Sequence, residues 1–91
     1  MKKKVFPFWV GPKILAEVQS VGQGKRAEYV IQAVERFAKA GAVQMFHEKK
    51  VKTVSICFDG KHWLRVLEVA KELNCNLTDI VRGAFIPKGE K

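Results

Sequence analysis

A strand-like stretch followed by two helix-like stretches occurs twice along this 91-residue sequence, and this repeat limits the fold more than any other feature. In the second copy, residues 53–58 alternate apolar and polar side chains, which is the two-residue period of a half-buried strand. Asp59 then offers a capping oxygen, and residues 60–73 carry apolar side chains at helical spacing. The layout of a capping box at residues 76–79 begins a second apolar stripe, which predicts another helix ending before Pro87.

The first half of the sequence follows the same order. Residues 5–10 form an apolar run that predicts a strand, and Pro12 stands at a position that helices accept near their start. Two glycines within residues 22–24 favour a turn, and residues 26–39 then carry an apolar stripe that predicts a long helix. Gly41 is the expected stop of that helix.

The stretch LEVAKELNCNLTDIVRGAF resembles the two-helix region typical of ribbon-helix-helix DNA-binding proteins of the Arc and MetJ type. The stretch GQGKRAEYVIQAVERF is similar to it, although Ala27 stands where the family usually has Ser or Thr. The resemblance implies a mainly α fold with a short β-ribbon, made of two ribbon-helix-helix units in the order β-α-α-β-α-α. The expected units are residues 5–40 and 52–86, joined by a linker at 41–51, in one pseudo-dimeric domain over residues 1–91.

Each half of the sequence contains a single predicted strand, so each strand needs a partner strand from outside its own half. A single strand leaves its backbone groups without partners, and in the family two chains pair their strands. We therefore expect residues 5–10 and 53–58 to form a two-stranded antiparallel ribbon within one chain. Pairing of each half with a half of another chain is the alternative.

The charge of the chain is strongly positive. Seventeen Lys and Arg residues against nine Asp and Glu residues give a formal net charge of +8, which favours an acidic polymer, with DNA ahead of a membrane surface. No apolar run approaches the roughly 17–25 residues that a membrane-spanning helix needs. The run at residues 5–10 is too short for a secretory leader. Two cysteines are too few for a disulfide framework, so we expect reduced thiols and a cytoplasmic location.

Patterns typical of enzymes and metal sites are missing from the sequence. There is no nucleophile with a base at a recognisable spacing, no Gly-rich phosphate loop and no pair of acids placed for proton transfer. The spacing of His47, Cys57, His62 and Cys75 does not resemble that of known zinc modules. We therefore expect no catalysis, no cofactor and no small-molecule ligand.

The resemblance implies a sequence-specific regulator of transcription that inserts its ribbon into the major groove of double-stranded DNA. If the apolar side chains of residues 53–58 face inward, the polar side chains between them form the outer face. With Gly11 of the first half aligned to Gly60 of the second, the same alternation turns Phe6 and Phe8 outward, whereas a slip of one residue buries them and turns Pro7 and Trp9 outward. The candidate base-contacting residues are Lys4, Phe6, Phe8, Lys52, Thr53, Ser55 and Cys57.

Contacts to the DNA backbone are expected at the N-terminus of the second helix of each unit. The free N–H groups and the positive dipole end of a helix favour an anion there. The lysines at the start of the chain are a candidate basic arm. The candidate phosphate-contacting residues are Lys2, Lys3, Lys25, Arg26, Asn76, Leu77 and Thr78.

Two other functions are compatible with the sequence. A protein-interaction module, antitoxin-like or a scaffold, would keep the fold without reading bases, and the apolar first strand favours it. A nonspecific DNA-packing protein would bind all duplexes alike, and self-association on DNA is a further open alternative. Trp63 lies at helical spacing with apolar residues and is expected in the core.

Overall fold

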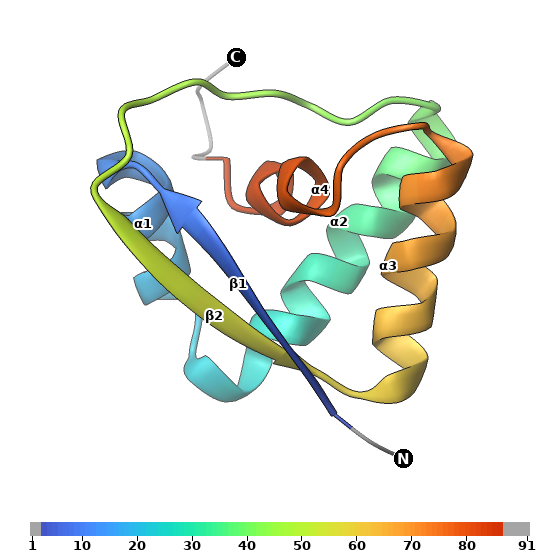
Figure 1. Ribbon diagram of the computed structural model, residues 1–91, viewed down its shortest axis with the longest axis horizontal. Helices are drawn as coiled ribbons and strands as arrows, with labels where there is room; N and C mark the ends of the chain where they lie inside the picture. The colour runs from blue at the N-terminus through green and yellow to red at the C-terminus, as the bar shows by residue number, and fades with distance from the viewer. Residues whose placement is uncertain (1–2, 87–91) are drawn as a thin grey trace.

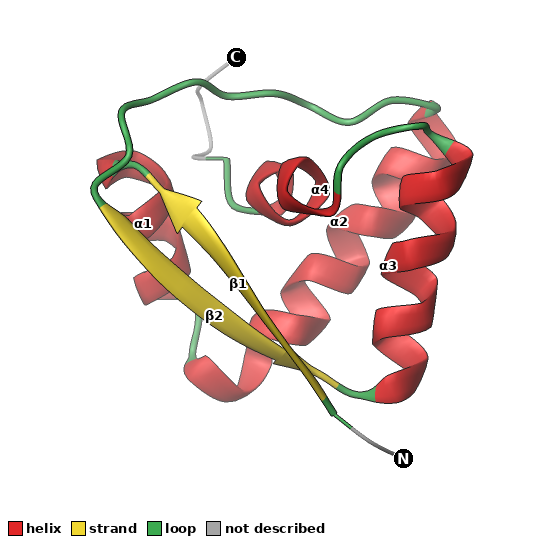
Figure 2. Ribbon diagram, viewed as in Figure 1, coloured by secondary structure: helices red, strands yellow, loops and turns green. Residues whose placement is uncertain are grey.

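Two strands that are far apart in the sequence lie side by side at the front of the structure (Figure 1). The computed structural model describes residues 3–86 of the chain. Within this range the protein is mostly helical with one two-stranded antiparallel sheet, so the coarse prediction of a mainly α fold with a short ribbon is confirmed (Figure 2). The elements are β1 (Lys4–Val10), α1 (Pro12–Ser20), a 3-10 turn (Gln23–Lys25), α2 (Arg26–Ala40), β2 (Lys52–Phe58), α3 (Gly60–Glu72) and α4 (Leu77–Ala84).

The core lies between one face of the ribbon and the helices. Helix α2 passes behind the ribbon in Figure 1, with α1 and α3 on opposite sides of it. Every second residue of each strand and one stripe of each helix face inward, and together they form this core. The largest fully buried side chains come from both halves of the chain and are Val10, Ile14, Val18, Val30, Val34, Phe58, Val66, Val69, Ile80, Val81 and Phe85.

Local signals set most helix ends. Asp59 accepts a hydrogen bond from the His62 N–H at 2.9 Å and caps α3, as the sequence predicts. Gly41 ends α2 in the left-handed conformation, with a φ of 74° that glycine adopts without strain. The predicted capping box at the start of α4 is wrong. Asn76 occupies the N-cap position there, but its side chain makes no capping hydrogen bond.

The start of α1 is capped by a residue from the segment that leads into β2. Gly11 is its N-cap residue and has no side chain to offer, whereas the carboxylate of Glu48 accepts hydrogen bonds from the Lys13 and Ile14 N–H groups at 3.0 and 2.9 Å. A Cβ atom at Gly11 would collide with the Glu48 side chain. The absence of a side chain at Gly11 therefore allows a distant carboxylate to satisfy the first turn of α1.

The connection between α2 and β2 packs against the last helix. Residues 41–51 arch over α4 in Figure 1, and the Phe46 carbonyl accepts a hydrogen bond from Arg82 at 3.1 Å. A Cβ atom at Gly83 would lie 2.9 Å from the Gln44 carbonyl oxygen, so this segment approaches the α4 backbone closely. The segment expected to be only a linker is thus part of the packed structure.

Helices α2 and α3 are also joined by an ion pair. The Arg65 guanidinium donates to both carboxylate oxygens of Glu35, at 2.6 and 2.7 Å, and a second acid, Glu68, lies on its other side.

None of the helices in residues 3–86 combines the length and apolar character needed to cross a bilayer.

Candidate nucleic-acid interface

The outer face of the ribbon carries the side chains that do not enter the core. In the strand register Val5 pairs with Cys57, Pro7 with Ser55 and Trp9 with Thr53, and residues paired across an antiparallel ladder point to the same face. Of these six side chains, five are exposed and Trp9 is half-buried. The structure therefore presents one continuous surface, defined here as the outer face: Val5, Pro7, Trp9, Thr53, Ser55 and Cys57.

The predicted placement of Phe6 and Phe8 on this surface is wrong. Phe8 is only 3% exposed and stacks on Phe85, with ring centroids 6.3 Å apart. Phe6 is half-buried and packs against Trp63, with ring centroids 5.5 Å apart. Both phenylalanines stabilise the inner side of the ribbon, and the register slipped by one residue is the observed one.

The error arises from the glycines used to align the two halves. Gly11 is the N-cap residue of α1, whereas Gly60 is already the first residue of α3 and Asp59 is its N-cap residue. Gly11 is therefore the counterpart of Asp59 and not of Gly60. Moving the alignment by one residue exchanges the inner and outer faces of β1 because side chains alternate along a strand.

The candidate residues of β2 lie where the sequence predicts them. Thr53, Ser55 and Cys57 are exposed on the outer face. Lys52 and Lys4 occupy the opposite ends of the ribbon, paired with Val10 and Phe58, at inward positions that the core does not cover. They therefore flank the outer face at its two ends and are not part of it.

Lysines gather at both ends of the ribbon. The pairing of Lys4 with Phe58 brings Lys3, Lys4 and Lys61 to one end, and the Lys4 ammonium lies 5.7 Å from the centre of the Trp63 ring. The opposite end carries three more exposed lysines at and before the start of β2: Lys49, Lys50 and Lys52. The outer face therefore has a group of exposed lysines at each of its two ends.

The expected phosphate-contacting residues before α2 have different surroundings. Lys25 is exposed in the 3-10 turn. Arg26 is half-buried, and its Nε donates to the Val18 carbonyl at 3.1 Å, so this side chain joins the end of α1 to the start of α2. Only Lys25 therefore presents its charge without a partner from the core.

At the start of α4, backbone N–H groups rather than side chains are the candidate contacts for an anion. Asn76 is exposed, while Leu77 and Thr78 are half-buried and Leu77 packs against the core. The first-turn N–H groups can still meet an anion, but Asp79 in the same turn places a negative charge beside them. Lys3 is exposed, and Lys2 lies outside the described residues.

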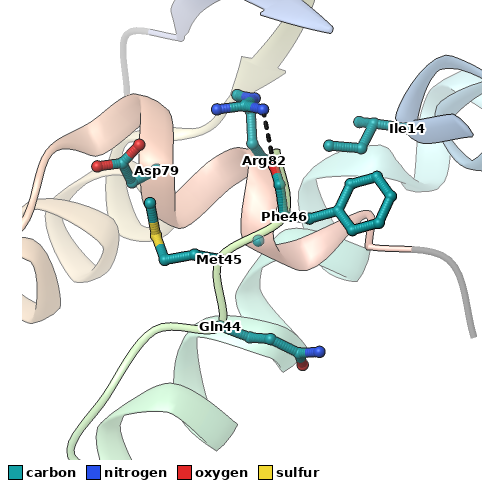
Figure 3. A pocket seen from close by; sticks show the side chains of 7 residues that line it. Ile14, Gln44, Met45, Phe46, Asp79 and Arg82 are labelled. Atoms are coloured by element: carbon teal, nitrogen blue, oxygen red, sulfur yellow. Dashed lines mark hydrogen bonds between the residues drawn. The ribbon is translucent and has the colours of Figure 1, made fainter. Parts of the chain in front are cut away.

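Sequence reasoning missed the link between Trp9 and Arg82. The Arg82 side chain is 7% exposed, its guanidinium carbon lies 3.7 Å from the centre of the Trp9 ring, and its Nη2 donates to the Phe46 carbonyl (Figure 3). The Nε of Arg82 is buried without a hydrogen-bond partner. An arginine inside the apolar stripe of α4 was the available signal, but its partners come from residues far away in the sequence.

Hollows in the described part of the chain are small or shallow. The cavity beside Arg82 in Figure 3 has a volume of about 10 Å³, which suits nothing larger than a water molecule. A second, open depression lies at the turn before α2 and is lined by Lys25 and Tyr29, among others. Across residues 3–86 no three His, Cys, Asp or Glu side chains are grouped so that they could hold a metal ion.

The two thiols differ in their surroundings. Cys57 is exposed at the outer face, whereas Cys75 is half-buried before α4. Burial, together with the negative charge of Asp79, raises the pKa of the Cys75 thiol above its usual value. Cys57 is consequently the more accessible thiol for a chemical probe.

Comparison of this chain with protein-family models, curated proteins and solved structures finds no match. Its function therefore has to be inferred from its own residues.

Proposed function

We propose that the protein is a sequence-specific double-stranded DNA-binding regulator of transcription that inserts the β1–β2 ribbon into the major groove. The observation that carries this proposal is an exposed outer face with a group of lysines at each end of the ribbon. A two-stranded ribbon fits the major groove, and lysines at its ends can neutralise the phosphates on both sides.

The proposal includes a tandem ribbon-helix-helix arrangement. It is supported by the order β1, α1, α2, β2, α3, α4 and by antiparallel pairing of the two strands within one chain. It is also supported by the contacts of α2 with both α3 and α4, which join the helices of the two halves. In this arrangement the outer face reads bases, while Lys25 and the first-turn N–H groups of α2 and α4 contact phosphates.

The salt dependence of duplex binding tests the electrostatic part. Each phosphate contact contributes a slope of about −0.9 to log K against log[salt], so six lysines at the ribbon ends give a slope of up to about −5. Lys52→Gln should reduce the slope by about one contact, whereas Lys39→Gln at the end of α2 should leave it unchanged. A slope near zero for the wild type would refute DNA binding.

Specificity is tested separately from affinity. Ser55→Ala and Thr53→Ala should relax sequence preference, since their hydroxyls face the bases in this proposal. Lys25→Ala should weaken binding to all duplexes alike, because a phosphate contact carries no sequence information. If all three variants change the binding of selected and random duplexes by the same factor, this division of roles is wrong.

Cys57 offers a direct report of which face is covered. In a Cys75→Ser variant, Cys57 is the one remaining thiol of the chain, and bound duplex should slow its alkylation by iodoacetamide. Protein docking is the alternative function, favoured by the apolar side chains of β1 on the outer face. A stoichiometric partner protein that protects Cys57, together with no protection by any duplex, would support docking instead.

A further inference from the structure

The two strands present different chemistry on the same outer face. From β1 come Val5, which is 58% exposed, together with Pro7 and Trp9. From β2 come Thr53, Ser55 and Cys57. Along β1 the exposed side chains of Val5 and Pro7 carry no hydrogen-bond donor or acceptor, whereas Thr53 and Ser55 each carry a hydroxyl that does both.

This difference limits what each strand can recognise. In the major groove thymine is the one unmodified base that presents a methyl group, and apolar side chains contact that methyl group. An apolar side chain placed against the polar edge of a G·C pair would leave donors and acceptors unpaired. Val5 and Pro7 therefore favour thymine, while the hydroxyls of β2 accept several base edges.

Trp9 adds a fixed apolar surface at the far end of β1. Its ring stacks on the guanidinium of Arg82, which is itself held by the Phe46 carbonyl at 3.1 Å. A ring stacked on a buried cation loses little further freedom when it meets a ligand. The apolar side of the outer face thus has a rigid end.

We propose that β1 reads thymine methyl groups, so that the DNA site is asymmetric. One side of the site is defined by thymine methyl groups under Val5, Pro7 and Trp9. The other side is defined by hydrogen bonds to Thr53 and Ser55. This inference rests on the proposed function, and it follows from a ribbon whose two strands have different sequences, since identical strands would demand a palindrome.

The test begins by selecting binding sites from duplexes with a randomised core. Each thymine of the selected site is then replaced by deoxyuracil, which lacks only the 5-methyl group. Loss of one contacted methyl group should weaken binding by roughly fourfold, and the sensitive thymines should lie on one side of the site. Val5→Ser should abolish the uracil effect at one position, because serine lacks the methyl groups with which valine contacts the thymine methyl. Leu64→Gln, at a similarly exposed apolar position on α3, should leave every uracil effect unchanged.

The outcomes separate the two proposals. Selection of no duplex, with a salt slope near zero, would overturn the proposed function and this inference with it. A selected palindrome, or a site in which uracil binds as well as thymine throughout, would overturn the inference while DNA binding stands. Uracil sensitivity that persists at every position in Val5→Ser would overturn the assignment of Val5.

Discussion

Removing the carboxylate of Glu48 should destabilise the protein although this residue belongs to no helix or strand. Its oxygens receive the Lys13 and Ile14 N–H groups, and its charge lies at the positive end of α1. Loss of a helix cap costs about 0.5–2 kcal/mol, and the dipole contributes about 0.3–1 kcal/mol more. We therefore expect Glu48→Ala to lower the free energy of unfolding by about 1–2 kcal/mol.

The close approach of Gly11 allows this reasoning to be tested by a double-mutant cycle. Gly11→Ala places a Cβ atom where the Glu48 side chain lies, so the carboxylate has to leave and the same cap is lost. The double variant should then be about as stable as either single variant, because the cap is lost only once. Gly11→Ser combined with Glu48→Ala should regain about 1 kcal/mol, since Gly11 has the extended backbone typical of an N-cap residue and serine can cap from there.

Urea unfolding followed by circular dichroism measures these differences, and each 1 kcal/mol should shift Tm by roughly 4–8 °C in a domain of this size. Lys49→Ala, at the exposed neighbouring position, is the matched control and should change stability by less than about 0.5 kcal/mol. If the losses in Glu48→Ala and Gly11→Ala are additive in the double variant, the carboxylate does not act as the cap.

Two further predictions concern packing and pH. Phe8→Ala should lower the free energy of unfolding by about 3–5 kcal/mol, because the ring is buried. Ser55→Ala on the outer face should lower it by less than about 0.5 kcal/mol. Similar losses in the two variants would contradict the strand register. The hydrogen bond from Arg65 lowers the pKa of Glu35 below its ordinary value of 4.5. The stabilisation by this ion pair is therefore present above that value and is lost as the pH falls through the lowered pKa. Denaturation measured against pH should show the stability difference between wild type and Glu35→Gln shrinking in acid and in high salt, and a difference that is constant with pH would contradict this.

Most of the helices could be predicted from the sequence because they depend on local patterns, and the pairing of the strands could be predicted because a lone strand needs a partner. The alternation in residues 53–58, the cap at Asp59 and the stop at Gly41 are all confirmed. The inner and outer faces of β1 could not be assigned, since residues 5–10 are apolar throughout and contain no alternation to read.

Long-range contacts account for the rest. Glu48 caps a helix that begins 36 residues earlier in the chain, at Pro12, and no sequence pattern around Glu48 predicts this role. Arg82 likewise finds Trp9 and the Phe46 carbonyl only after the chain has folded. These partners determine part of the candidate interface, so the contacts of Trp9 could not be predicted from local sequence patterns.

The capping of α1 by Glu48 also bears on how the two halves depend on each other. The first half has glycine at the N-cap of its first helix, and the capping carboxylate comes from a segment that enters the second half. If the chain were divided after α2, the first fragment would lack the cap of its own helix until the second fragment joined it. The two halves are therefore not interchangeable, and a first half made to fold by itself would require a new capping residue at position 11.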